Sequence, residues 1–233
     1  MNYSVNLYRS DPLRKRYAGG VEEERRRGRQ AEAARNDQLL LTAAREVFGA
    51  QGFDAPVAAV AERAGLGIGS LYRRYGTKEE LLQRLCVLAM EQVCEAAATA
   101  LRHDDPWAGL VCYVAECVNF GSGGLAPIAG RIATTPEMWE THQRAHRLTG
   151  RVITRAHTDG VLRRDVTALD VSLLIEQFSR RPCGPRDPAE DNIRRRLLAI
   201  AVEGLHARNT DPLPGRRPSL RRYQERWIPN DRP

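Results

Sequence analysis

With 233 residues, the chain is long enough to bury a hydrophobic core in one or two domains. It has no apolar run near the ~20 residues of a membrane span, and its first thirty-five residues are polar and carry no signal pattern. We therefore expect a cytoplasmic protein without a membrane partner. Its five cysteines form no CxxC pair, which favours small apolar core residues over a disulfide framework, with a thiol sensor as the alternative.

The net charge of +7 comes from the two ends of the chain. Residues 1–35 contain nine Lys and Arg against five Asp and Glu, residues 211–233 contain six against three, and residues 36–210 balance at 21 of each. Charged termini of this kind are either solvated and disordered or add salt-dependent contacts to DNA phosphates. For the N-terminal end, the arginines within residues 25–29 directly precede the first predicted helix, from where an arm could reach a minor groove.

Residues 38–50 show helical apolar periodicity and predict an amphipathic helix, after which Gly52 ends the pattern. A second stripe at Val57, Val60 and Ala64 predicts a helix of about two turns. Gly65 follows at the position where a left-handed residue commonly ends a helix. A third helix is predicted over residues 70–75.

A helix, a short glycine-containing turn and a basic second helix form a helix-turn-helix, which suits the DNA major groove. Any αα-hairpin of a helical protein could show the same turn with arginines on its solvated side. The preceding helix at 38–50 favours the DNA-binding interpretation, because three helices over about fifty residues are the usual minimum of such a domain.

The runs AAREVFGAQGF and VAAVAERAGLGIGSLYRRYGTKEELL resemble the DNA-binding domain of the tetracycline-repressor (TetR) family of bacterial transcription regulators. The resemblance covers about fifty of the 233 residues. Two places depart from the family pattern, Ala55-Pro56 at the start of the second helix and Gly76-Thr77 after the third. The matching positions are Ala43, Ala44, Phe48, Gly52, Phe53, Val60, Ala61, Ala64, Gly65, Ser70, Leu71, Tyr72, Tyr75, Lys78 and Glu79.

We predict DNA contacts from the third helix and the start of the next. Arg73 and Arg74 are candidates for guanine edges, because a planar guanidinium fits O6 and N7. Tyr75 is expected in the core. In the family that the chain resembles, the lysine at the position of Lys78 binds a DNA phosphate, and Lys78 is one of only two lysines among 36 basic residues. The remaining predicted phosphate contacts are Gly69, Ser70, Tyr72 and Thr77.

Beyond residue 78 the chain predicts a succession of helices and no strand, so the expected fold class is all-α. The expected helices span 79–102, 106–120, about 127–133, 136–157, 168–180 and 188–207, with cap signals at Asp105, Thr135, Thr167 and Asp187. The expected organisation is a basic, flexible arm (1–34), a helix-turn-helix domain (35–82), a helical effector-binding and dimerisation domain (83–208) and a basic, disordered tail (209–233).

The last two predicted helices of the body carry broad apolar stripes. Paired with a second copy, they would form a four-helix dimer interface. The alternative is that the stripes only close the core of one protomer, and the resemblance favours a homodimer on a palindromic operator. The predicted interface residues are Leu173, Leu174, Phe178, Leu197, Ile200, Ala201 and Leu205.

The middle helices are expected to enclose a ligand pocket, although large apolar residues there could equally be ordinary core. His142 and His146 stand four residues apart, a spacing compatible with a metal, but no further ligand cluster accompanies them, so we expect neither a metal nor a cofactor. The predicted pocket residues are Met90, Trp107, Tyr113, Glu116, Asn119, Phe120, Met138, Trp139 and His142.

The resemblance implies a transcription regulator, most often a repressor that a small-molecule effector releases from its operator, although activation stays open. The alternatives are an all-helical enzyme that uses Glu116 and His142, or a helical adaptor with a vestigial DNA-binding head. The enzyme is disfavoured because the sequence shows no nucleophile elbow, metal cluster or paired catalytic motif.

Overall fold

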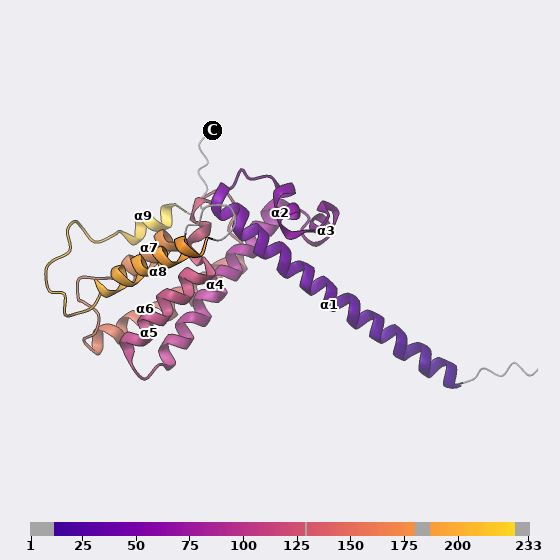
Figure 1. Ribbon diagram of the computed structural model, residues 1–233, viewed down its shortest axis with the longest axis horizontal. Helices are drawn as coiled ribbons and strands as arrows, with labels where there is room; N and C mark the ends of the chain where they lie inside the picture. Colours follow the sequence, from indigo (N-terminus) through magenta and orange to yellow (C-terminus); the bar gives the residue numbers. More distant parts are fainter. Residues whose placement is uncertain (1–11, 129, 180–186, 227–233) are drawn as a thin grey trace, which may run out of the picture. The chain divides into compact units, whose positions relative to one another are not determined.

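The computed structural model describes residues 12–128, 130–179 and 187–226. The described chain is all-α, as predicted, and its one β-type contact is an isolated bridge between Leu162 and His206. No helix in these ranges has both the length and the hydropathy of a membrane span. The elements are α1 (Pro12–Gln51), α2 (Val57–Ala64), α3 (Ile68–Arg74), α4 (Lys78–Arg102), α5 (Pro106–Phe120), η1 (Ser122–Ile128, a 3₁₀ helix), α6 (Pro136–Thr158), α7 (Ala168–Ser179), α8 (Pro188–Glu203) and α9 (Leu220–Glu225) (Figure 1).

The chain divides into two units, residues 1–39 and 40–233. In the first unit, the predicted arm is helical from Pro12 onward, whereas periodicity places the start of this helix at residue 38. The described side chains between Arg27 and Arg35 are exposed, so no apolar stripe marks this part of the helix. The stretch is instead rich in Glu, Arg and Ala, which have good intrinsic helix propensity, and proline at the first helical position favours the start.

The predicted helix-turn-helix domain at the start of the second unit, which we call the head, packs residues 40–51 of α1 against α2, α3 and the first turns of α4 around one hydrophobic cluster. Phe48 and Leu71 are fully buried at its centre. Helix α2 has the predicted bounds, and Gly65 ends it in the left-handed conformation at φ 67°. This glycine allows the chain to reverse within three residues before α3 begins at Ile68, two residues earlier than expected.

Helices α4 to α8 form the body around a second hydrophobic cluster. The predicted caps are confirmed, because Asp105, Thr135 and Asp187 each accept a hydrogen bond from a backbone N–H two or three residues ahead. Asp170 likewise accepts from the backbone of Thr167 at the start of α7. Helix α7 is described to Ser179, and the predicted end at Arg180, like Cys183, lies outside the described residues.

The glycine-rich break after α5 brings η1 against α7. Gly121 closes α5 at φ 79°, as the predicted break requires. A side chain at Gly123 would place its Cβ 2.4 Å from the Cα of Glu176, so only glycine allows this close approach. The short helix lies at residues 122–128 instead of the expected 127–133. The sequence alone could not place it, because its position depends on this contact with α7.

The C-terminal tail is folded as far as it is described. Residues 208–219 form a loop, and α9 follows (Figure 1). Its position is fixed by contacts with the body, which include hydrogen bonds from the tail to Arg164 and Asp165 and an ion pair between Arg226 and Glu176. The expectation of a disordered tail rested on its charge and proline content, neither of which reveals these partners.

Candidate DNA-binding face and ligand cavity

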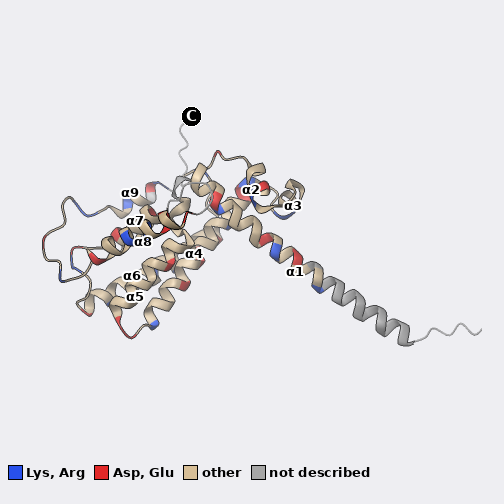
Figure 2. Ribbon diagram, in the orientation of Figure 1, with Lys and Arg blue, Asp and Glu red and all other residues tan. Residues whose placement is uncertain are grey.

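Helix α3 presents an aromatic and basic face outward. Tyr72 is 49% exposed, and Arg73 and Arg74 are exposed beside it. In Figure 2, where Lys and Arg are blue, a basic stretch lies on α3. Tyr75 is 6% exposed and belongs to the core of the head, as predicted. Leu71 of α3 and Tyr75 directly after it therefore anchor the helix in the head, while Tyr72, Arg73 and Arg74 lie on the surface.

The two arginines differ in their local contacts. Arg73 folds back along α3, where its guanidinium donates to the Gly69 carbonyl at 3.2 Å and to the Ser70 hydroxyl at 3.1 Å. The Arg74 guanidinium lies 5.7 Å from the centre of the Tyr75 ring. Gly69 and Ser70, both predicted DNA contacts, thus position Arg73. Such contacts orient an exposed guanidinium before a ligand arrives.

Ile68 is a surface residue that the sequence analysis missed. It is 46% exposed at the first position of α3, in the same element as the predicted contacts. An exposed isoleucine near a nucleic-acid face can contact a thymine methyl group. The sequence signal for Ile68 is Gly67 directly before it. A turn at this glycine lets the helix start earlier than the apolar pattern indicates.

Lys78 holds the start of α4 against the head. Its ammonium donates to the Ala55 carbonyl at 2.7 Å and lies 4.8 Å and 5.4 Å from the ring centres of Phe53 and Phe48. The side chain is half-buried. This contact gives a physical reason for a lysine at a helix start, where the helix dipole disfavours a cation. The phosphate contact that the resemblance assigns to Lys78 stays a prediction.

Thr77 caps α4, and its hydroxyl accepts from the Glu80 backbone N–H at 3.1 Å. The Glu80 carboxylate in turn accepts from the Gly76 backbone N–H at 2.9 Å. The reciprocal pair resembles a capping box and fixes the angle at which the chain leaves α3. Thr77, a predicted phosphate contact, therefore also has a structural role.

The body contains a cavity of about 510 Å³ on the inner side of α4, α6 and α7, with η1 and α9 completing its wall. Five of the nine predicted pocket residues line it: Met90, Tyr113, Met138, Trp139 and His142. Its other lining residues are Cys86, Ala89, Val93, Ser122, Gly123, Leu125, Thr134, Ala145, His146, Thr149, Ala168, Leu169, Ser172, Ile175, Glu176, Leu220 and Tyr223.

The four other predicted pocket residues lie elsewhere. Glu116 and Asn119 are exposed on the outer side of α5. Trp107 packs against His206, with ring centres 4.5 Å apart, and Phe120 lies under the Arg45 guanidinium at 4.5 Å. All four lie on α5, and their size or polarity alone suggests a pocket. Which side of α5 faces the cavity depends on how α5 packs, and this was not visible in the sequence.

Most of the cavity wall is apolar, with a few neutral polar groups and the Glu176 carboxylate. Burial and the neighbouring His146 lower the pKa of His142, which keeps its imidazole uncharged at neutral pH. Burial raises the pKa of Tyr113 above its ordinary value, and its hydroxyl lies 2.9 Å from that of Thr149. The Ser122 hydroxyl is buried and has no hydrogen-bond partner among the residues that the structure describes. Such a lining suits an apolar ligand that carries a small number of polar groups.

The pKa values of the buried thiols argue against a thiol sensor at two positions. Burial raises the pKa of Cys86 and of Cys117 to about 12, so both are protonated and poorly nucleophilic near neutral pH. Among the described residues no three His, Cys, Asp or Glu side chains come together as a metal site. The rings of His142 and His146 stack with centres 6.2 Å apart.

Two routes join the cavity to the head. Helix α4 begins at the Lys78 contact and lines the cavity two to four turns later, at Cys86, Met90 and Val93. The second route is the segment 130–135 before α6, in which Thr134 lines the cavity. From the same segment, Arg131 donates to Asp54 at 2.9 Å and lies 4.6 Å from the centre of the Phe53 ring, and the Ala133 N–H donates to Glu79 at 2.7 Å.

The predicted dimer residues separate into two groups. Leu174, Phe178 and Leu205 pack against the core of the body. On α8, Leu197 and Ile200 are 51% and 60% exposed, and Ile193 on the same helix is 60% exposed. These three residues fall at i, i+4 and i+7 and form one apolar stripe on the outer side of the helix, which we call the α8 stripe. Leu173 and Ala201 are half-buried.

Family models match two stretches of the chain. Residues 40–85 match the model described as bacterial regulatory proteins of the tetR family, and residues 105–207 match the C-terminal domain of SbtR-like transcriptional regulators. The chain belongs to the TetR family. The first match covers the head described above, and the second covers most of the body but ends before the tail, so the family assignment includes both the DNA-binding domain and the cavity-bearing domain.

Solved structures support the TetR fold at low sequence identity. A TetR regulator from Mycobacterium vanbaalenii is 23% identical, with a TM-score of 0.52, and the match covers 76% of this chain and 98% of the other. The regulator LfrR from Mycobacterium smegmatis, solved with proflavine, is 19% identical over 77% of this chain and 99% of its own, with a TM-score of 0.55. SCO0520 from Streptomyces coelicolor is 21% identical, with a TM-score of 0.52, and the match covers 73% of this chain and 98% of the other. None of the curated proteins compared with the chain matches it.

Proposed function

We propose that this TetR-family regulator is a homodimeric repressor that binds a palindromic operator and releases it when a small molecule enters the cavity. The observation that carries the proposal is the placement of an exposed basic α3 and an apolar cavity at two points along the same helical framework. The operator contacts that we propose are Arg73 and Arg74 at base edges, with Gly69, Ser70, Tyr72, Thr77 and Lys78 toward phosphates. As a DNA-binding regulator it would act in the cytoplasm.

The α8 stripe supports the dimer. Three large aliphatic side chains at least half exposed in a row would be costly in water, and a second copy of the same helix could cover them. A single short recognition helix reads only a few base pairs, whereas two heads read two half-sites and multiply the specificity. The proposed interface therefore centres on Ile193, Leu197 and Ile200, with Leu173, Leu174, Phe178, Ala201 and Leu205 around it.

Effector release requires the ligand to bind one head arrangement better than another. A ligand that displaces Met90 or Thr134 would push on α4 or on the segment 130–135. Both elements contact the head, through Lys78 and through Arg131. Because packed helices move as units instead of deforming, a small shift at the cavity would change the distance between the two heads of the dimer.

The direct test measures binding to the DNA upstream of the protein's own gene by mobility shift and footprinting. We expect a protected palindrome that is lost in the Arg73→Ala/Arg74→Ala variant. LfrR was solved with proflavine, so this compound is a reasonable first member of an effector screen for this chain. Loss of the retarded complex on addition of a compound would identify an effector.

The same experiment separates the alternatives. An adaptor with a vestigial head would protect no DNA at low salt, and an activator would raise transcription from the bound site. An enzyme would keep its turnover in the Arg73→Ala/Arg74→Ala variant. Of the two residues that the enzyme would use, Glu116 is exposed on α5 and does not line the cavity with His142, so the geometry does not favour the enzyme.

A further inference from the structure

The cavity has one charged group in its wall among the described residues, the carboxylate of Glu176 on α7. This residue is 4% exposed. A buried carboxylate is unfavourable unless a cation or hydrogen bonds compensate it. Whatever compensates Glu176 therefore decides what the cavity can bind.

One compensating cation comes from the C-terminal tail. The Arg226 guanidinium donates to both carboxylate oxygens of Glu176, at 2.9 Å and 3.2 Å. A planar bidentate pair of this kind is a strong and geometrically specific contact. Arg226 itself stays 38% exposed, so it covers Glu176 from the solvent side. Two other tail residues, Leu220 and Tyr223, complete the cavity wall.

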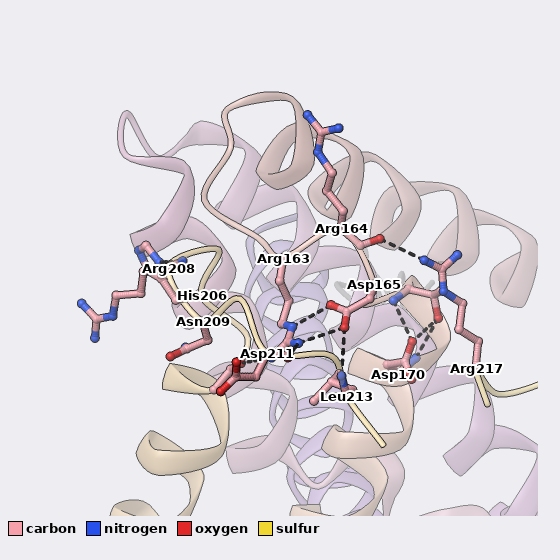
Figure 3. A network of polar contacts seen from close by, with 12 residues as sticks. Arg163, Arg164, Asp165, Asp170, His206, Arg208, Asn209, Asp211, Leu213 and Arg217 are labelled. Carbon is pink, nitrogen blue, oxygen red and sulfur yellow. Dashed lines mark hydrogen bonds and ion pairs between the residues drawn. The ribbon is translucent and has the colours of Figure 1, made fainter. Parts of the chain in front are cut away.

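The beginning of the tail is held separately from its end. Arg163 is 8% exposed and donates to both oxygens of Asp165, at 2.6 Å and 2.9 Å, and to the backbone carbonyls of Gly204 and Asp211 (Figure 3). Asp165 also accepts from the Leu213 N–H at 3.2 Å. We call Arg163, Asp165 and the tail backbone at Asp211 and Leu213 the tail anchor.

The tail anchor is independent of the cavity, because none of its residues lines it. Between the anchor and α9 the chain passes Gly215 at φ 87° and Arg217, which donates to the Arg164 carbonyl at 3.2 Å. Helix α9 is only six residues long. It could therefore leave the body while the anchor keeps the tail attached.

We propose that Glu176 is a recognition site for a cationic group on an otherwise apolar ligand, and that Arg226 occupies this site until such a ligand displaces α9. The proposal rests on the proposed function only in identifying this cavity as the effector site. A guanidinium, amidinium or amine on the ligand would replace the Arg226 guanidinium, and its apolar part would lie among the residues of α4 and α6. The uncharged His142 and the partnerless Ser122 hydroxyl add no competing positive charge.

The test uses p-aminobenzamidine, a fluorescent probe whose amidinium has the same planar pair of N–H groups as arginine. Its neutral match is 4-aminobenzamide. We expect Arg226→Ala to bind the amidinium at least about tenfold more tightly than the wild type, because the probe no longer competes with the tail. Changing Glu176 to Gln in the Arg226→Ala protein should abolish the gain, and the neutral amide should show none.

Arg221→Ala is the matched control, since Arg221 lies on the same helix and pairs with Glu225 outside the cavity wall. It should bind both probes like the wild type. Arg226→Lys keeps the charge but loses the bidentate geometry, and it should give a smaller gain than Arg226→Ala. If Arg226→Ala does not fold, the lysine variant still decides the question.

Hydrogen exchange measures the displacement directly. Saturating p-aminobenzamidine should accelerate exchange in residues 220–226 of the wild type and leave residues around the tail anchor unchanged. An unchanged rate in 220–226 would overturn the displacement. An equal gain for the neutral amide would show that Arg226→Ala merely opens the cavity, and would overturn the cation site.

Mobility shift on the operator keeps the two proposals apart. If p-aminobenzamidine binds as expected but does not weaken operator binding, the cation site stands and effector control by this cavity fails. If operator binding is normal and the amidinium gain is absent, the regulator stands and the cation site is wrong.

Discussion

The head and the cavity are built in opposite ways. In the head, residues 40–74 form three helices whose exposed faces follow from local signals, and most of the proposed contact residues lie within α3. The cavity collects side chains from α4, α5, η1, α6, α7 and α9, which are separated by more than a hundred residues of chain. A surface that reads DNA needs one rigid helix, whereas a cavity needs several elements to converge on one space.

The largest expected effect is on DNA binding by the head, and it leaves the cavity unchanged. Arg73→Ala/Arg74→Ala should weaken operator binding on the order of 100-fold or more, since each base-edge contact contributes about 1–3 kcal/mol. Both side chains are exposed, so the melting temperature should stay near that of the wild type. Fluorescence anisotropy at fixed salt measures the affinity. Unchanged affinity would show that α3 is not the recognition helix.

The next largest effect separates the two heads of a dimer while leaving each head folded. Leu197→Arg should place a charge in the centre of the α8 stripe and dissociate the protein, because an unpaired buried charge is strongly unfavourable at an interface. Light scattering after gel filtration gives the mass in solution. Arg195→Ala, a change at an exposed α8 residue outside the stripe, serves as the control. A Leu197→Arg protein with the wild-type mass would place the dimer interface elsewhere.

A smaller effect tests whether Lys78 holds the head together. Lys78→Ala removes the hydrogen bond to the Ala55 carbonyl, and hydrogen bonds to charged groups contribute about 1.5–3 kcal/mol. Urea unfolding should therefore show a lower free energy of unfolding. Arg63→Ala is the comparison, because it breaks only an exposed ion pair with Glu46 that contributes about 0–1 kcal/mol. Equal losses of unfolding free energy in the two variants would contradict a structural role for Lys78.

The smallest effect concerns acid and the tail anchor. The Arg163 guanidinium lowers the pKa of Asp165 from 3.8 to about 2 in the folded protein. A carboxyl group with a lowered folded pKa stabilises the protein above its unfolded pKa, and this contribution is lost as the pH falls from about 4 toward 2. The melting temperature of Asp165→Asn should thus lie slightly below that of the wild type at about pH 6 and converge with it toward about pH 2. A difference that does not change with pH would contradict this origin.

Local chemistry explains which parts of the fold could be predicted. Caps such as Asp105, Thr135 and Asp187 act within three residues, so the starts of their helices were predicted correctly. Tyr75 was correctly predicted in the core because helical periodicity alone puts it on the same side as Leu71. The stretch 12–37 was missed because a helix without an apolar stripe leaves no periodic signal.

The sequence by itself determined the all-α class, the helix-turn-helix and its exposed arginines, because each depends on the spacing of residues within one or two turns. Only the tertiary structure decided which residues line the cavity, that Lys78 contacts Ala55, and that Arg226 reaches Glu176 across 50 positions of the chain. These contacts depend on how helices rotate and pack against one another, and a single sequence contains no local signal for that rotation.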